Sequence, residues 1–280
     1  MDINEIFKEL DELFKKNEID KVEPFLTDCL VNARETNNFG IYISVGNELI
    51  GFYRSISAYQ KAVSMAEDVL YLMKKLNLED TEHYATTLLN IATAYRAAGQ
   101  VDQAYEYYET ALAIYEKLLP PNDYRFASLY NNLSILLEGQ DKNEEAVAYL
   151  EKALFIIKEL DETSVEYATS LTNLALLNFK QNKVEEAKEK LELALTIFDK
   201  KGENTDAHYS AALAGVGEAY YHMKEYQKSL DAYEKALEEI QKHFGENESY
   251  SLISQNCAAI CDQLGDTPKA EDYRKRANNK

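Results

Sequence analysis

Asparagines recur at a regular spacing along the chain. Asn90, Asn132 and Asn173 follow one another at a nearly constant step, and Asn256 follows at twice that step. Asparagine is unfavourable inside helices because its amide competes for backbone hydrogen bonds. The same amide offers a donor and an acceptor, so it can satisfy both the N–H and the C=O of an extended peptide. Its repetition at one position therefore needs a physical reason.

A second row of residues follows the first at a distance of six. It reads Arg54, Arg96, Glu138, Phe179, Tyr221 and Asp262. The whole chain has six arginines, so two at one repeat position are informative. A guanidinium can hold a carboxylate in bidentate fashion, which predicts a contact with a ligand's acidic side chain or C-terminus. The alternative is an ion pair with a neighbouring acidic helix, because the chain carries 49 acidic residues. Phe179 and Tyr221 would continue the row as an aromatic wall.

The motifs of catalysis are missing from the sequence. It has no glycine-rich phosphate loop, no histidine and carboxylate set at metal-binding spacing, and no serine or cysteine motif with a base nearby. Cys257 and Cys261 lie one helical turn apart, at positions held in another repeat by Ile91 and Tyr95. We interpret them as packed thiols rather than half of a metal site. We expect no enzymatic activity, no metal and no cofactor.

Both rows belong to a longer repeat. Small residues recur every 41 or 42 positions at Ala62, Ala104, Ala146, Ala187, Ser229 and Ala270, and a second set follows seven positions later at Val69, Ala111, Ala153, Ala194, Ala236 and Ala277. In residues 84–118 the apolar positions have helical spacing on two segments, with Gly99 between them. The pattern predicts a hairpin of two antiparallel helices, A and B. One hairpin cannot bury its own apolar stripe, so the copies must stack.

The period sets the expected boundaries. Residues 41–277 should form twelve helices, with turns near positions 57, 99, 140, 182, 224 and 265. We expect a single domain over 1–280, made of a degenerate capping hairpin at 1–38, repeats over 41–246, and a last repeat and tail at 249–280. Pro24 and Pro268 should lie in the first turns of B helices, behind Asp20 and Asp266 as N-caps. Further helix starts are predicted at Thr81, Asp123, Ser164, Thr205 and Asn247.

The register of Ala104, Tyr108, Ala111 and Leu112 resembles the tetratricopeptide repeat family. The unit here is longer than the family's usual length of about 34 residues. It looks most like the long repeats of kinesin light chains, whose helix A start is similar to LTNLA at 171–175 and YNNLS at 130–134. The resemblance implies an all-α, right-handed solenoid of about seven helical hairpins.

The resemblance also implies a binding surface. In this family the position of the asparagine row faces the concave groove, and in kinesin light chains its asparagines bind the backbone of an extended peptide. The peptide-binding residues implied here are Asn90, Asn132, Asn173, Asn256, Arg54, Arg96, Phe179 and Tyr221. The alternative for the asparagines is structural, with each amide bridging adjacent A helices.

The charge of the chain limits its partners. A net charge of −19, spread along the helices, disfavours nucleic acid and anionic membranes. No signal-peptide pattern and no apolar run of membrane-spanning length is present, so we expect a cytosolic protein.

We therefore predict a scaffold that binds a peptide or an unstructured protein segment, with self-association left open. One alternative is a peptide-responsive bacterial regulator, although such proteins usually carry a separate output module and the acidic first hairpin is a poor candidate for one. The other is a structural or self-assembling adaptor. A motor role lacks support, because no heptad segment accompanies the repeats.

Overall fold

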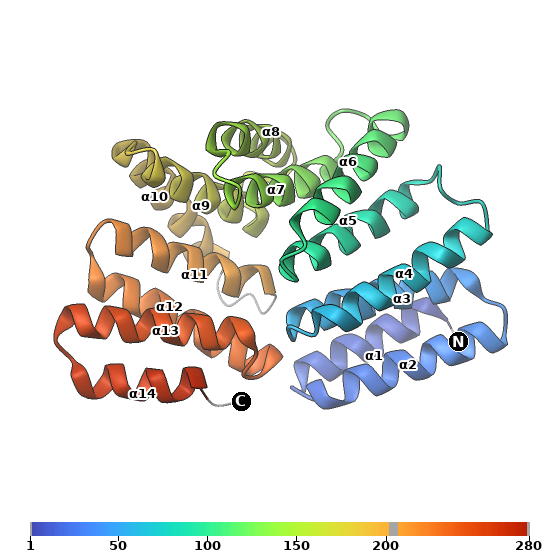
Figure 1. The fold of residues 1–280 in the computed structure, drawn as a ribbon, viewed down its shortest axis with the longest axis horizontal. Coiled ribbons are helices and arrows are strands. Elements are labelled where there is room, and N and C mark those ends of the chain that lie inside the picture. Colours follow the sequence, from blue (N-terminus) through green and yellow to red (C-terminus); the bar gives the residue numbers. More distant parts are fainter. Residues whose placement is uncertain (1, 202–206, 279–280) are drawn as a thin grey trace. The chain divides into compact units, whose positions relative to one another are not determined.

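The computed structural model describes residues 2–201 and 207–278, and this part of the chain contains helices and no strand (Figure 1). The prediction of an all-α protein is confirmed. The helices are α1 Ile3–Lys15, α2 Ile19–Glu35, α3 Phe39–Ser55, α4 Tyr59–Lys75, α5 Glu82–Ala97, α6 Val101–Leu118, α7 Tyr124–Glu138, α8 Asn143–Asp161, α9 Val165–Lys180, α10 Val184–Lys201, α11 Ala207–His222, α12 Tyr226–Phe244, α13 Glu248–Leu264 and α14 Thr267–Asn278.

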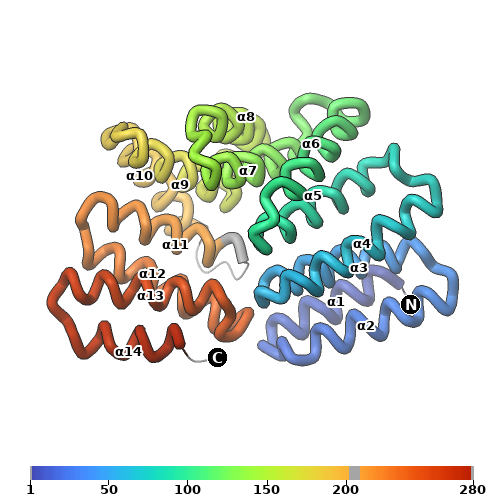
Figure 2. The backbone as a smooth tube through the Cα atoms, in the orientation of Figure 1, coloured from blue at the N-terminus to red at the C-terminus, as the bar shows by residue number. Residues whose placement is uncertain are grey.

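Odd-numbered and even-numbered helices pair as antiparallel hairpins, so they are the A and B helices of the repeat (Figure 2). Each A helix ends in a tight turn with one residue at positive φ. These residues are Asn17, Ser57, Gly99, Asp141, Asn182, Lys224 and Gly265. In the third hairpin Gly99 N–H donates to Arg96 C=O and Gln100 N–H to Tyr95 C=O, at 3.0 and 2.9 Å, which is a Schellman ending. The predicted turn positions are therefore correct, with a shift of one residue from 140 to Asp141.

The chain divides into two compact units, residues 1–125 and 126–280. In the first, α5 packs against α3, α4 and α6; in the second, α9 packs against α8, α10 and α11. Each of these two A helices thus contacts two B helices and one neighbouring A helix. The prediction of one continuous domain stays a prediction.

The small residues of the repeat lie where helices approach closely. Ala62, Ala104, Ala146, Ala187, Ser229 and Ala270 are all fully buried. A serine is tolerated at this otherwise alanine position because the hydroxyl of Ser229 donates a hydrogen bond of 2.6 Å to the carbonyl of Gly217. A Cβ at Gly217 would lie 2.9 Å from the ring of Tyr233. The helices are therefore in contact with no room for larger side chains.

Most of the predicted helix starts are confirmed. Thr81, Ser164 and Asn247 cap their helices by accepting a hydrogen bond from the backbone N–H three residues later. The Asp123 carboxylate accepts from Arg125 N–H and that of Asp266 from Lys269 N–H, while Thr205 lies outside the described residues.

The prediction for the second helix was wrong. Helix α2 already begins at Ile19, so Asp20 lies within its first turn and Pro24 lies inside the helix. Residues 16–18 close the preceding turn by backbone hydrogen bonds alone, such as that from Glu18 N–H to Leu13 C=O, and the helix starts without a side-chain cap.

Replacing Ala146 or Ala187 with Leu should lower the free energy of unfolding by about 1–3 kcal/mol, because overpacking forces helices apart. Ser229→Leu should cost a comparable amount, since it also removes the hydrogen bond to Gly217. Chemical denaturation measures this, with Ala148→Leu at an exposed position of α8 as the control. If all three buried variants matched the control, the assigned repeat phase would be wrong.

Candidate functional site

The second predicted row occupies one structural position in every hairpin that contains it. Arg54, Arg96, Glu138, Phe179, Tyr221 and Asp262 each accept, through the backbone carbonyl, the N–H of the positive-φ residue three positions later. The turn geometry therefore fixes these side chains at the last turn of each A helix.

Members of this row differ in how their charges are balanced. Glu138 forms an ion pair with Lys180, and Asp262 forms one with Arg274. Within the described residues, neither Arg54 nor Arg96 forms an ion pair, and the Nε of Arg96 is buried without a hydrogen-bond acceptor. The structure thus gives no support to the reading of these arginines as partners of a neighbouring acidic helix.

The charge of Arg96 acts on Arg54. They lie on α3 and α5, which pack together in the first unit. Desolvation is the main cause that lowers the pKa of Arg54, and the charge of Arg96 lowers it further, against an opposite effect of Tyr108. A guanidinium group carries its positive charge throughout the pH range in which proteins are folded. Two cations are therefore held near each other, partly out of water, with no carboxylate paired to either in the described part of the chain.

The asparagine row is less uniform. Asn90 donates a hydrogen bond of 2.9 Å to the side chain of Asn47, which joins α5 to α3 as the structural interpretation requires. Asn132 donates to the carbonyl of Ser128 in its own helix at 2.9 Å. Asn256 donates to the hydroxyl of Tyr233 at 3.4 Å, and Asn173 makes no hydrogen bond within the described part of the chain. Whether this row binds a ligand stays a prediction.

Another amide position provides bridges that the sequence reasoning missed. Asn47 donates to the hydroxyl of Thr87 at 3.1 Å, joining α3 to α5. Asn131 accepts from the hydroxyl of Ser170 at 3.0 Å, joining α7 to α9. Asn47 and Asn131 occupy the same repeat position, one residue before the predicted row. The sequence contained one signal for these bridges. In the A helix that follows each asparagine, a hydroxyl residue, Thr87 or Ser170, occupies the same repeat position.

In the second unit, two predicted residues come together. Tyr221 on α11 and Asn256 on α13 line one cavity of about 490 Å³, along with Tyr233 of α12. His222 connects the aromatic members of the row, because its ring stacks on Phe179 with centroids 5.9 Å apart and meets Tyr221 edge-on at 6.4 Å. Phe179 is buried, whereas Tyr221 is 41% exposed. Of the two rings, Tyr221 is the one able to contact a ligand.

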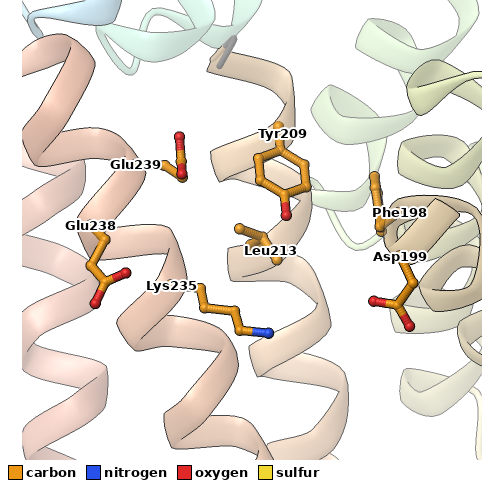
Figure 3. Close-up of a pocket in the computed structure, with 7 residues that line it drawn as sticks. All are labelled: Phe198, Asp199, Tyr209, Leu213, Lys235, Glu238 and Glu239. Atoms are coloured by element: carbon orange, nitrogen blue, oxygen red, sulfur yellow. The ribbon is translucent and has the colours of Figure 1, made fainter. Parts of the chain in front are cut away.

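A smaller cavity, of about 320 Å³, lies among α10, α11 and α12 (Figure 3). Lys235 and Glu239 extend from α12 toward α11, whereas the Glu238 carboxylate points away. None of the eight predicted site residues lines this cavity. We therefore place the candidate site on the A helices.

Metal ligands and thiols were the remaining candidates for chemistry in the sequence. No three or more His, Cys, Asp or Glu side chains among them are grouped to hold a metal ion. Cys257 and Cys261 are fully buried, and burial raises the pKa of the Cys257 thiol to about 12, so they are packed thiols. No helix in the described part is long and apolar enough to cross a membrane.

Comparison with known proteins identifies the repeat. The tetratricopeptide repeat model matches residues 43–117, 125–200 and 209–277. The chain belongs to the tetratricopeptide repeat family. Among curated proteins it is similar to Protein KINESIN LIGHT CHAIN-RELATED 1 of Arabidopsis thaliana, with 25% identity over 131 residues, which are 46% of this chain and 21% of that relative. The chain thus spans about a fifth of the relative it matches.

Two solved structures share this fold. BtubC (BKLC) from P. vanneervenii aligns at 23% identity with a TM-score of 0.54, over 80% of this chain and 88% of that one. The Rap conjugation gene regulator of plasmid pLS20, solved in complex with the Phr* peptide, aligns at 17% identity with a TM-score of 0.70, over 95% of this chain and 69% of that one. The prediction of kinesin-light-chain-like tetratricopeptide repeats is confirmed.

Two asparagines of the row should differ in their contribution to the stability of the free protein. Asn90→Ala should lower the free energy of unfolding by about 0.5–1.5 kcal/mol, because it removes the hydrogen bond to Asn47. Asn173→Ala should leave stability unchanged or raise it by up to about 0.7 kcal/mol, because alanine is the better helix former. Urea denaturation of both variants measures the difference. A marked loss of stability in Asn173→Ala would assign that residue a structural role too.

Arg54→Met should raise the free energy of unfolding by about 0.5–2 kcal/mol, the usual gain when an unfavourable residue is replaced. The reason is that a partly desolvated charge without a counter-ion opposes folding. Arg125→Met is the control, because Arg125 is ion-paired to Asp123 and Glu82 and its loss should destabilise the protein. Destabilisation by Arg54→Met would show that Arg54 has a stabilising role in the free protein.

Proposed function

We propose that this chain is a non-catalytic binding scaffold and that its A helices receive an extended peptide or an unstructured protein segment. One observation supports this most directly. In a chain with 49 acidic residues, Arg54 and Arg96 lie on neighbouring A helices and have no acidic partner in the described part, whereas acidic members of the same row are paired. A cation pair that the fold leaves unbalanced is suited to an anionic group of a ligand.

The asparagines would supply contacts that do not depend on ligand sequence. Neighbouring A helices pack at about 10 Å and an extended peptide advances about 3.3 Å per residue, so each repeat would meet about three ligand residues. Asn173 keeps its amide free of hydrogen bonds within the described residues. It therefore retains both a donor and an acceptor to pair with a peptide backbone.

A second function is favoured by the likeness to the Rap regulator, which covers 95% of this chain. That protein was solved with a bound peptide, so a peptide-responsive regulator is the alternative. Small-angle scattering with and without a binding peptide separates the two, because a regulator should change its dimensions on binding and a scaffold should not. Sedimentation without peptide tests the remaining alternative, a self-assembling adaptor.

The binding proposal is tested by calorimetric titration against capped, unstructured peptides of graded acidity. The triple variant in which Asn90, Asn132 and Asn173 are all replaced by Ala should bind every peptide more weakly. The loss of binding free energy should be about 0.5–1.5 kcal/mol for each lost hydrogen bond. The double variant in which Arg54 and Arg96 are both replaced by Gln should lose affinity for the acidic peptides selectively. Its binding should also depend less on salt concentration. An acidic peptide with and without a free C-terminus distinguishes side-chain from terminal carboxylate recognition.

The double variant Lys8→Gln with Arg34→Gln is the matched control for this titration, because it also removes two positive charges from the first unit, at positions outside the row. Equal loss of acidic-peptide affinity in the control and in the double Arg variant would attribute the effect to net charge alone. A triple Asn variant that binds normally but unfolds early would assign the asparagines a structural role.

A further inference from the structure

Two residues in the second unit depart from their repeat positions. Glu218 occupies a position of helix A that the other repeats fill with the uncharged residues Gly51, Thr93, Ile135, Leu176 and Ala259. Leu252 occupies one that they fill with the small residues Ser44, Thr86, Ser128, Thr169 and Ala211. The fold forms without a charge or a large apolar group at these positions, so neither residue is needed for stacking.

Both exceptional residues line the same cavity. Glu218 on α11 and Leu252 on α13 lie in the wall of the 490 Å³ cavity that also contains Tyr221, Tyr233 and Asn256. Leu252 is 58% exposed, an unusual environment for a large apolar side chain. The last two A helices therefore place an acidic group, an exposed aliphatic group and the ring of Tyr221 together, and Tyr233 of α12 adds a second tyrosine ring.

The charge that lines the cavity is negative. No lysine or arginine is among its described lining residues, and Glu218 is its carboxylate. The nearest basic group in the lining is His222, with its Nε2 4.0 Å from the Glu218 carboxylate, and it is charged only when protonated. Lys180 also senses the charge of Glu218 but is paired with Glu138. Within the described residues, the negative charge of Glu218 therefore faces the cavity without a permanent counter-ion.

The tyrosines add a surface that favours cations. Burial, followed by the charge of Glu218, raises the pKa of Tyr233, so its phenol stays neutral at physiological pH. The negative faces of such rings attract ammonium and, more often, guanidinium groups. A guanidinium can stack on an aromatic ring and donate two parallel hydrogen bonds to a carboxylate at the same time, which an ammonium cannot.

We propose that this cavity receives a basic side chain, arginine in preference to lysine, from the segment bound along the A helices. The inference rests on the proposed function and names the chemistry of one ligand position. Glu218 pairs with the guanidinium, Tyr221 contacts its flat face, and Leu252 covers the aliphatic part of the side chain. Asn256 lies beside them, in position to bind the adjoining backbone.

The test uses capped single residues as probes, namely the Nα-acetyl N-methylamides of arginine, lysine, citrulline and norleucine. Citrulline has the shape of arginine without its charge, and norleucine is apolar throughout. Affinities are measured on the full chain from NMR shifts of Tyr221, Leu252 and Asn256. Arginine should bind about tenfold more tightly than citrulline, which is about 1.4 kcal/mol, because its hydrogen bonds to a carboxylate are charge-assisted. Lysine should bind with an affinity between the two.

Glu218→Gln should abolish the preference for arginine over citrulline and leave norleucine unaffected. Glu189→Gln, an exposed change on α10 with the same effect on net charge, should leave all four affinities as in the wild type. Equal binding of arginine and citrulline, tightest binding of norleucine, or no shifts with any probe would each overturn the proposal. Tightest binding of norleucine would identify the cavity as an apolar pocket.

Failure here is distinguishable from failure of the proposed function. A chain that binds extended peptides through Arg54 and Arg96 but does not discriminate arginine from citrulline refutes only the cavity assignment. A chain that binds the arginine probe but no extended peptide refutes the scaffold and retains the cavity as a site for a small cation.

Discussion

The structure depends on close contact between helices at the repeated small residues. Ala62, Ala104, Ala146, Ala187, Ser229 and Ala270 are fully buried, so the B helices that carry them approach their A helices closely in the rotational setting that turns these small residues inward. That setting determines which side chains of helix A are left facing away from the B helices. The same steric requirement explains the hydroxyl of Ser229, which is small and finds an acceptor in Gly217.

The turn after helix A adds a second constraint. A residue at positive φ and a recurring pattern of backbone hydrogen bonds end the A helices at the same point of the repeat. The row that contains Arg54, Arg96 and Tyr221 is consequently displayed at an equivalent place in each of its hairpins. The backbone is constant while the side chains vary, and this is how a repeat scaffold places different chemistry at equivalent positions.

Charge distribution distinguishes the two units. The first holds two guanidinium groups without acidic partners among the described residues, and the second holds a carboxylate next to tyrosine rings. In a chain with net charge −19, the unbalanced arginines are the less expected feature, since an acidic partner could have been supplied by many positions.

The sequence by itself determined the fold. The repeat period and the small-residue positions were sufficient because helix packing is a local requirement that each copy repeats. N-caps such as Thr81 and Ser164 were predictable for the same reason, since a cap acts within one turn. Pro24 was misplaced because nothing local distinguished a helix starting at Ile19 from one starting after Asp20.

Tertiary structure decided what the individual site residues contact. The rows were visible in the sequence, but Asn90 turned out to bridge to Asn47, while Asn173 has no partner in the described residues. Likewise, the acids Glu138 and Asp262 are paired and the arginines of the same row form no ion pair in the described part. These differences depend on which side chains of neighbouring helices reach one another in space. A periodic pattern fixes the position of a side chain, whereas its partner is set by the packing of helices from different repeats, as in the bond between Asn90 and Asn47.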